Sequence, residues 1–350
     1  MIVLLEKSNK KKINNFENDL TNEIKILKEK NNKFEEEISI LSEKNNELNN
    51  KINEIVERNR YQDEILDAYR TEFQILFFDY KLESQGLLKY FQEMGVEMLV
   101  FVKNVCEKYD LDYWLDFGNL LGSVRHKGYI PWDDDLDMGM MRKDFNKFMK
   151  VLDNEIMRFD LENNLRWNID KDVVSNNWVR SFFKIYYFDQ YNHPLGAIDI
   201  FPYDFLMEKN EDTEELYYEE KYFFHKKIID GLAREEAEKD YYEKLGLDYD
   251  SGPYILPGID GVRGNGQGEH KFGYYEYEDI FPLNQIEFCG EYFKCPNNPD
   301  SYLKNIYGDY HSHPKIIHHH DVVEKMHKIP NLELEFIKEI KKIKHINNTF

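Results

Sequence analysis

The segment Asp116 to Arg142, DFGNLLGSVRHKGYIPWDDDLDMGMMR, constrains the fold more than any other part of the chain. Alternating apolar residues predict a strand over residues 112–117, after which Gly118 permits a tight turn or a close backbone approach. Residues 119–125 have the pattern of the first turns of a helix. A strand that leads through a glycine turn into a helix N-terminus presents free N–H groups to a phosphate. We therefore expect four residues to lie against a phosphate: Gly118, Asn119, Gly122 and Ser123.

Carboxylates follow this turn in a second predicted strand, over residues 134–140. Alternation places Asp135 and Asp137 on one face, where two carboxylates can share a hard divalent cation such as Mg²⁺. Asp199 interrupts an apolar run in the second strand of a hairpin predicted over residues 179–206. Because a buried Asp needs a charge partner or a metal, Asp199 is the natural third ligand if the two strands are neighbours.

Basic and aromatic residues lie between the glycine turn and the acids. We expect the positive charge for a phosphate ester to come from Arg125, His126 and Lys127. Trp132 and Tyr113 either form a wall for a cationic group or pack in the core. The acids just before the strand, Asp133 and Asp134, are either proton acceptors or turn formers.

The N-terminal segment has a heptad pattern of apolar residues over about six heptads. The d positions are Leu20, Leu27, Phe34, Leu41, Leu48 and Ile55, and the a positions are Ile24, Asn31, Ile38, Asn45, Ile52 and Asn59. A buried Asn pairs with another Asn across a parallel dimer and penalises other registers. The pattern predicts a parallel two-stranded coiled coil of roughly 65–70 Å. The alternative is a single charged helix.

Composition narrows the class of protein. The net charge of −21 disfavours nonspecific binding to nucleic acid. Three cysteines indicate a reducing compartment, and Cys289 and Cys295 are either half of a zinc site or ordinary hairpin residues. The first five residues are too short an apolar run for a signal peptide, and no run approaches the ~18 apolar residues of a spanning helix. We expect a soluble, cytoplasmic protein.

Two further tracts are less specific. The glycine-rich residues 258–273 lack the ending of a P-loop and form either a surface loop or a lid. Histidines cluster between His311 and His327 without a standard zinc spacing, and they either bind a metal or contact phosphate.

Three stretches of the chain together resemble the LicD family of phosphocholine transferases and its fukutin-related ribitol-phosphate relatives. They are YWLDFGNLLGSVRHKGYIPWDDDLDMGM, AIDIFPYDF and FPLNQIEFCGEYFKCPNNPDSYLKNIYGDY. The resemblance covers roughly residues 87–328 and excludes the heptad segment. At position 119, where family members often carry Thr, this chain has Asn119.

The resemblance implies an α/β (α+β) fold with a nucleotidyltransferase-like mixed sheet and flanking helices, here preceded by the long coiled-coil helix. It also implies that Asp135, Asp137 and Asp199 hold Mg²⁺ or Mn²⁺ and that residues 118–123 meet the donor phosphates. We expect four parts: a coiled coil over 1–60, a connecting helix over 61–86, a catalytic domain over 87–330 and a C-terminal helix over 331–350.

The implied reaction moves a phospho-alcohol, such as phosphocholine, from a CDP-linked donor to a sugar hydroxyl and releases CMP. Asp134 or Asp133 would accept the hydroxyl proton. Choline, ribitol and glycerol stay open as the alcohol, and teichoic acid, lipopolysaccharide or another lipid-linked glycan precursor as the acceptor. A lipid-linked acceptor would bring the protein to the inner membrane face as a peripheral partner. The alternatives are a nucleotidyltransferase that uses CTP and a noncatalytic coiled-coil scaffold.

Overall fold

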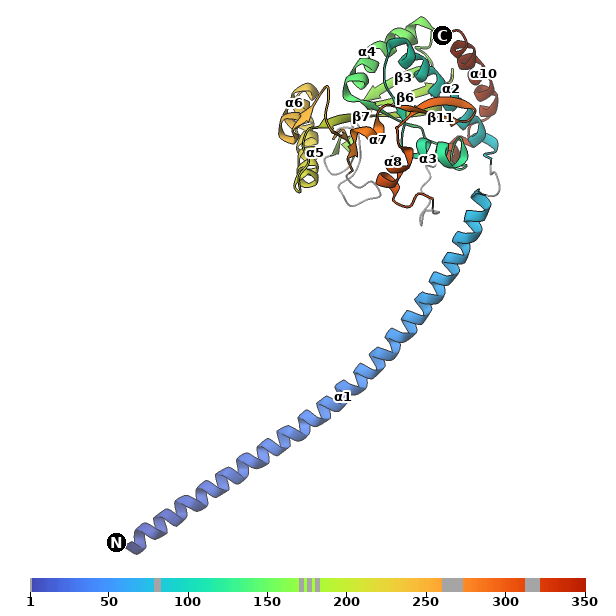
Figure 1. Cartoon of the computed structure of the whole chain (residues 1–350). Coiled ribbons are helices and arrows are strands. Elements are labelled where there is room, and N and C mark those ends of the chain that lie inside the picture. Colours follow the sequence, from blue (N-terminus) through green and yellow to red (C-terminus); the bar gives the residue numbers. More distant parts are fainter. Residues whose placement is uncertain are drawn as a thin grey trace. The chain divides into compact units, whose positions relative to one another are not determined.

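A computed structural model describes residues 2–78, 83–169, 173–174, 178–179, 183–259, 273–311 and 322–350 (Figure 1). Two compact units divide between Phe73 and Gln74. The predicted mixed α/β class with a long N-terminal helix is confirmed. The functional boundaries expected at residues 60, 86 and 330 stay a prediction. Most of the glycine-rich tract and of the histidine tract lies outside the described residues.

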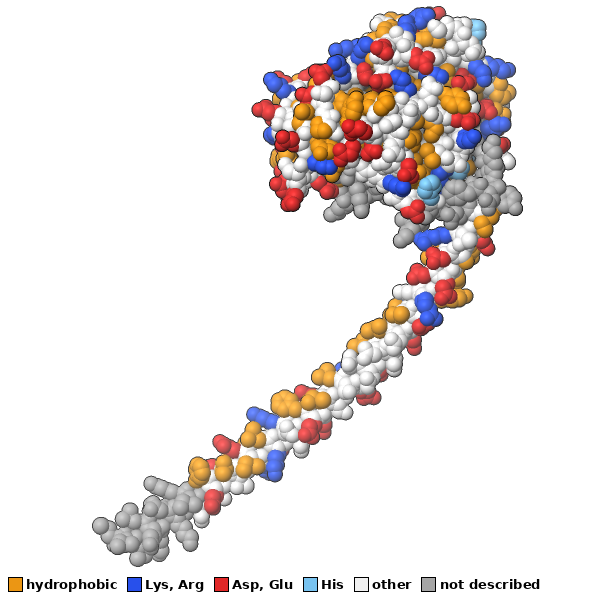
Figure 2. Space-filling model, viewed as in Figure 1, with side chains coloured by type: hydrophobic (Ala, Val, Ile, Leu, Met, Phe, Trp, Pro, Cys, Tyr) orange, Lys and Arg blue, Asp and Glu red, His pale blue; other side chains and the backbone are white. Residues whose placement is uncertain are grey.

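The N-terminal unit lies within helix α1 (Ile2–Phe78). The helix continues through residue 60 without a break, and residues 7–60 contain no Gly or Pro that would interrupt it. Its large apolar side chains between Phe16 and Leu76 are exposed, as the orange patches in Figure 2 show. Within the described ranges, no helix of the protein is both long and apolar enough to cross a membrane.

The C-terminal unit contains a sheet with the strand order β1-β2-β7-β6-β3, which β8, β9 and β10 extend. Among the described strands of this sheet, β2 and β7 pair in parallel and the other pairs are antiparallel. The strands are β1 (Trp114–Leu115), β2 (Asp137–Met141), β3 (Leu165–Ile169), β6 (Phe183–Phe188), β7 (Pro194–Leu206), β8 (Leu247–Asp248), β9 (Tyr254–Pro257) and β10 (Tyr275–Glu276). Two small hairpins lie outside it: β4 (Val173–Val174) with β5 (Trp178–Val179), and β11 (Asn284–Phe288) with β12 (Glu291–Cys295).

Helices surround this sheet. Helices α2 (Gly86–Tyr109) and α4 (Arg142–Arg158) contact β7, and α10 (Leu332–Asn347) packs on α2 (Figure 1). Met138, Met140, Ile198 and Ile200 are fully buried, and they alternate with Asp137 and Asp199 along β2 and β7. Alternation therefore turns the two carboxylates to the opposite face. The remaining helices are α3 (Phe117–His126), α5 (Thr213–Ile229), α6 (Arg234–Leu245), α7 (Tyr277–Ile280), α8 (Pro299–Tyr307) and α9 (Val322–Met326).

The predicted hairpin over residues 179–206 is confirmed as antiparallel β6 and β7. Two strand predictions were too long. Strand β1 has only two residues, because Asp116 already caps α3 and its carboxylate accepts from Phe117 N. Strand β2 begins at Asp137, because the two-residue β1 offers no partner to the residues before it. Asp135 therefore precedes the strand.

The cysteines do not form a zinc half-site. Cys289 lies in the turn of the β11–β12 hairpin with φ 52°, whereas Cys295 is buried at the far end of β12, opposite Asn284. Cys106 is buried in the core. All three follow the alternative of ordinary structural residues.

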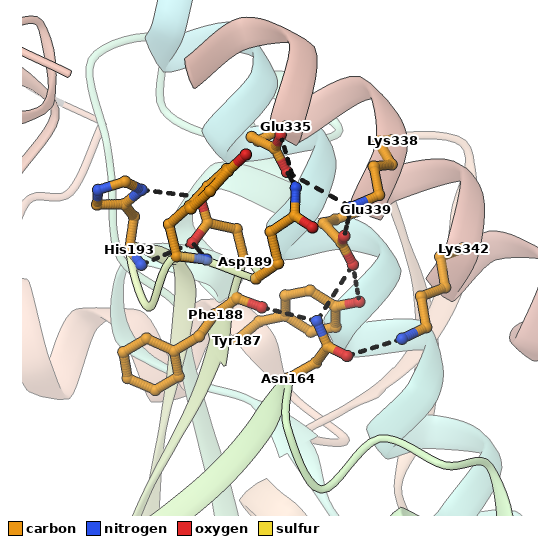
Figure 3. Close-up of polar contacts among 11 residues, drawn as sticks. Asn164, Tyr187, Phe188, Asp189, His193, Glu335, Lys338, Glu339 and Lys342 are labelled. Carbon is orange, nitrogen blue, oxygen red and sulfur yellow. Dashed lines mark hydrogen bonds and ion pairs between the residues drawn. The ribbon is translucent and has the colours of Figure 1, made fainter. Parts of the chain in front are cut away.

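A buried polar network fastens α10 to the sheet (Figure 3). The Glu339 carboxylate accepts hydrogen bonds from Tyr187 Oη at 3.0 Å and Asn164 Nδ2 at 3.2 Å. Lys342 Nζ donates to Asn164 Oδ1 at 2.7 Å, and Lys338 Nζ lies 3.1 Å from Glu339. The predicted amphipathic C-terminal helix is therefore an integral part of the fold.

A second, smaller hydrophobic core lies between the sheet residues Leu206 and Leu256 and the helices α5 and α6, and a buried ion pair on the main sheet contacts α6. Arg142 forms two hydrogen bonds of 2.8 Å, through Nε and Nη2, with the two oxygens of Asp204 on β7. Its Nη2 also donates to Tyr241 Oη of α6 at 3.0 Å. The two partners are 2% and 1% exposed, so each charge depends on the other.

We predict that Arg142→Ala lowers the free energy of unfolding by about 3–5 kcal/mol, because it leaves the Asp204 carboxylate buried without its partner. Chemical denaturation followed by circular dichroism measures this loss. The double variant Arg142→Met with Asp204→Leu removes both charges and should recover much of it. Equal stability of Arg142→Ala and the wild type would contradict the assigned role.

Candidate active site

Strand register brings two of the three predicted carboxylate ligands together. Asp137 on β2 lies directly opposite Asp199 on the parallel strand β7, and the Asp199 N–H donates to the Leu136 carbonyl at 2.7 Å. Directly opposite residues on adjacent strands project from the same face of a sheet. The condition that the sequence left open, that the two strands be neighbours, is met.

Asp133 and Asp135 join this group from the segment before β2. Burial, and next the charges of Asp135 and Asp199, raise the pKa of Asp137 well above its usual value. Burial and the neighbouring Asp135 likewise raise the pKa of Asp133. Like charges in a desolvated place repel one another, so this group of carboxylates favours a cation among them.

The described residues contain no three His, Cys, Asp or Glu side chains that already converge on a single point as a finished metal site. The chemistry of the carboxylate group nevertheless fits a hard ion, since all its side-chain donors are oxygens. A Mg²⁺ or Mn²⁺ ion would supply positive charge to neutralise phosphate oxygens.

The start of α3 lies against these acids. Asn119 Oδ1 accepts from the Asp137 N–H at 2.9 Å, while its Nδ2 is buried and has no acceptor among the described residues. The amide thus keeps only donor groups for a ligand. A Cβ at position 118 would lie 2.9 Å from Asp133 Oδ2, so Gly118 is needed for close approach. The turn itself is made by Phe117, at φ 37°.

Gly122 and Ser123 are used inside the fold. A Cβ on Gly122 would lie 2.3 Å from the Gly128 carbonyl oxygen, so this glycine makes room for the chain that leaves α3. The Ser123 hydroxyl donates to the Asn119 carbonyl at 2.9 Å, one helical turn back. The structure therefore places Asn119 closer to the carboxylates than either of these two residues.

The basic triplet diverges at the end of α3. Burial lowers the pKa of Arg125, and burial together with Arg125 lowers that of His126 to about 4. Lys127 is an exposed helix cap, and its Nζ lies 3.6 Å from Glu287 on β11. Trp132 is partly exposed, whereas Tyr113 is 1% exposed and belongs to the core. Tyr113 therefore follows the core-packing alternative.

Beneath the acids lies a buried hydrogen-bond network. Asp116 accepts from Tyr203 Oη at 2.6 Å and from Tyr302 Oη at 2.8 Å. Trp114 Nε1 donates to Tyr302 Oη at 3.1 Å, and the Asp116 N–H donates to the Asp137 carbonyl at 3.0 Å. Side chains from β1, β7 and α8 thus fix the position of Asp116, whose backbone bonds to Asp137.

With this geometry in view, comparison with known proteins shows that residues 110–239 match the family described as LicD/FKTN/FKRP, nucleotidyltransferase domain. This chain carries a LicD-family domain. The match includes Asp116, the start of α3, and all of the carboxylates described above.

Curated relatives match over shorter stretches. Lipopolysaccharide cholinephosphotransferase LicD of Haemophilus influenzae is 42% identical over 60 residues, which are 17% of this chain and 23% of that protein. Ribitol 5-phosphate transferase FKRP of Homo sapiens is 46% identical over 44 residues, 13% of this chain and 9% of that protein. The matched stretches thus span a quarter or less of these two relatives.

Sequence reasoning missed two residues that lie at the carboxylates, Lys184 inside the matched segment and Tyr307 outside it. Lys184 on β6 is opposite Asp199, and its Nζ lies 2.9 Å from Asp199 Oδ1. Burial lowers the pKa of Lys184, but the charge and the hydrogen bond of Asp199, together with Tyr186 and Asp137, outweigh burial and raise it. Burial, then Asp137 and Asp116, raise the pKa of Tyr307 on α8 well above its usual value. Lys184 had a signal, because it is a charged residue in the apolar strand FKIYYF.

Asp116 provides a test by pH. Burial raises its pKa to about 6 from 3.8, against the hydrogen bonds from Tyr203 and Tyr302 that lower it. The folded state therefore holds the proton more tightly than the unfolded state. Its contribution to the free energy of unfolding is highest below pH 3.8 and falls as the pH rises to about 6.

We predict that Asp116→Asn removes this dependence. Between about pH 4.5 and pH 7, the free energy of unfolding of the wild type should fall by about 2 kcal/mol relative to the variant. Urea denaturation of both proteins at a series of pH values measures the difference. A difference that does not change with pH would show that Asp116 does not titrate in this way.

Proposed function

We propose that this chain transfers a phospho-alcohol group, phosphocholine first among the candidates, from a CDP-linked donor to a glycan hydroxyl. The observation that carries the proposal is the pairing of Asp137 with Asp199 across β2 and β7, inside the segment that matches the LicD family. The names of the two relatives, a cholinephosphotransferase and a ribitol 5-phosphate transferase, support the class of reaction.

In this proposal Asp135, Asp137 and Asp199 hold a Mg²⁺ or Mn²⁺ ion, whose charge counters that of the donor pyrophosphate. The acceptor oxygen forms a bond to the phosphorus that bears the alcohol, and the bond from that phosphorus to CMP breaks. The electron pair leaves with CMP. The buried Asn119 Nδ2, which has no acceptor in the described part of the chain, donates to a phosphate oxygen, and Arg125 adds positive charge nearby.

We assign the acceptor of the hydroxyl proton to Asp133 rather than Asp134. Asp133 lies partly exposed beside Gly118 at the start of α3, and it is hydrogen-bonded to Asp135. Asp134 is only 6% exposed, so an acceptor sugar has poorer access to it. A proton acceptor has to come within hydrogen-bond reach of the proton it takes.

We predict that purified protein with Mg²⁺ releases CMP from CDP-choline, CDP-ribitol or CDP-glycerol. Asp137→Asn and Asp199→Asn should each lower the rate by at least about 10³-fold, which corresponds to some 4 kcal/mol of lost transition-state stabilisation. Removal of the metal with EDTA should have the same effect. Quantification of CMP and pyrophosphate by chromatography is the measurement.

Asp248→Asn on β8 is the matched control, because Asn keeps an oxygen that can accept from the N–H groups of Asp250 and Ser251. It should leave the rate unchanged. Pyrophosphate from CTP would instead establish a nucleotidyltransferase. Absence of both donor binding and turnover in the wild type would favour a noncatalytic scaffold.

We further propose that the protein works in the cytoplasm and meets a lipid-linked glycan precursor at the inner membrane face. The absence of a spanning helix among the described residues is compatible with a peripheral role. Teichoic acid and lipopolysaccharide precursors are the acceptor classes to try first.

Helix α1 is proposed to pair with a second copy of itself in parallel. The a and d side chains form an exposed apolar stripe, with Leu27, Ile38 and Leu41 each 64–65% exposed. The same heptad continues beyond residue 60: Gln62 occupies the next d position, and Leu66, Tyr69 and Phe73 then occupy a, d and a positions and are also exposed. A single helix leaves this stripe in water, and pairing would bury it.

Charges at the edges of the stripe support the parallel, in-register arrangement. Each charged g residue that meets a charged e residue of the second helix meets the opposite sign. The three attractive pairs are Glu23 with Lys28, Lys30 with Glu35, and Arg58 with Asp63. No like-charged g–e pair occurs between residues 23 and 63.

We predict that the protein has twice the chain mass of 42.3 kDa by light scattering at micromolar concentration. Leu41→Glu with Leu48→Glu should give monomers, because it places charge in the buried seam. Ser39→Glu with Asn46→Glu adds the same charge at b positions and should stay dimeric. Monomeric wild type would exclude the coiled coil.

A further inference from the structure

Lys184 occupies a distinctive place in the sheet. It lies opposite Asp199, which in turn lies opposite Asp137, so three neighbouring strands place these residues in one row. Directly opposite residues share a face, and the row therefore projects to the side of the carboxylates. On the next strand, β3, Asn168 lies opposite Lys184, so the lysine is the positive charge beside the two carboxylates of this row.

The contact between Lys184 and Asp199 is close and partly withdrawn from water. Nζ lies 2.9 Å from Oδ1 and 3.1 Å from Oδ2 of Asp199. The side chains are 22% and 14% exposed, so the pair is largely shielded but still reachable by a ligand. Ion pairs that are fully exposed to water contribute little to stability, whereas ion pairs that are shielded from water, as this one largely is, interact more strongly.

The chemistry of the two groups leaves room for a third partner. An ionised carboxylate has about four acceptor positions, and an ammonium group has three donors. One Asp199 oxygen can therefore stay with Lys184 while the other serves a cation. Because its ammonium group has three N–H donors, Lys184 can bind an anion on the same face in addition to Asp199.

We propose that Lys184 is a phosphate-binding residue of this site, which contacts the phosphates of the CDP-linked donor beside the Asp199 carboxylate. The inference rests on the proposed function. A phosphate ester that lies over the row would meet the ammonium group at the β6 end and the carboxylate-bound cation at the β2–β7 end. Positive charge on both sides holds the donor against the sheet.

A phosphate-binding role for Lys184 and a purely orienting role predict different effects of its removal on metal binding. If Lys184 only orients Asp199, its removal weakens metal binding and donor binding together. If Lys184 binds phosphate, its removal weakens donor binding but leaves metal binding at least as tight, because a competing cation has gone.

The test uses the full chain and the variant Lys184→Gln, which keeps a hydrogen-bond donor for Asp199 but removes the charge. Binding of Mn²⁺ alone is measured by electron paramagnetic resonance. Binding of CDP-choline, CDP-ribitol and CDP-glycerol with Mg²⁺ is measured by calorimetry. We expect the Kd for the donor to rise about 10- to 100-fold, as for loss of a charged hydrogen bond, with no weakening for Mn²⁺.

Two variants complete the comparison. Lys184→Arg keeps the positive charge and should retain more donor affinity than Lys184→Gln. Lys209→Gln breaks another Lys–carboxylate pair, 3.2 Å from Glu276, and should change neither affinity. Thermal unfolding of each variant confirms that the chain is folded.

Several results would overturn the inference. Unchanged donor affinity in Lys184→Gln, or equal losses for donor and Mn²⁺, would show that Lys184 does not bind phosphate. Wild type that binds none of the three donors would instead refute the proposed function, and the inference with it. Wild type that binds a donor, beside an unaffected Lys184→Gln, refutes the inference alone.

Discussion

The parallel pairing of β2 with β7 is the interaction on which the candidate site depends. It places Asp137 opposite Asp199 although 61 residues separate them along the chain. The register is specified from the other face, where Met138, Met140, Ile198 and Ile200 are completely buried. A shift by one residue would turn these side chains to the site and the carboxylates into the core, which is strongly unfavourable. Hydrophobic packing on one side thereby fixes polar geometry on the other.

The segment between β1 and β2 adds further polar groups to the paired carboxylates. Helix α3 begins at Phe117 and brings the Asn119 amide to the backbone of Asp137, where one half of the amide is satisfied by the fold. Asp116 is held below by two tyrosine hydroxyls from β7 and α8. Charged and polar groups are therefore fixed by neighbours before any ligand arrives. Such preorganisation is what electrostatic stabilisation of a phosphoryl transfer requires.

Much of this arrangement is predictable from local pattern, and the rest depends on long-range packing. Alternation in residues 134–140 and 195–206 predicts two strands with carboxylates on one face, and their neighbourhood is confirmed. The pattern does not show where β2 begins, because that depends on how far β1 extends as its partner. The roles of Gly122 and Ser123 inside α3 also depend on contacts, in particular on the Gly128 carbonyl. Lys184 was overlooked because its role depends on Asp199 in the neighbouring strand and not on the residues next to it in sequence.

The separate hydrophobic core under α5 and α6 has a consequence for how the protein opens. Leu206, Tyr217, Phe224, Tyr241 and Leu256 pack with one another and not with the large core behind β2. Groups of residues with their own core can unfold and refold as one cooperative unit while the rest of the protein stays native. This core includes Leu206 of β7 and Leu256 of β9, and Tyr241 of α6 also accepts a hydrogen bond from Arg142, which directly follows β2. Local unfolding of α5 and α6 would therefore remove a partner of Arg142 at the end of the strand that carries Asp137.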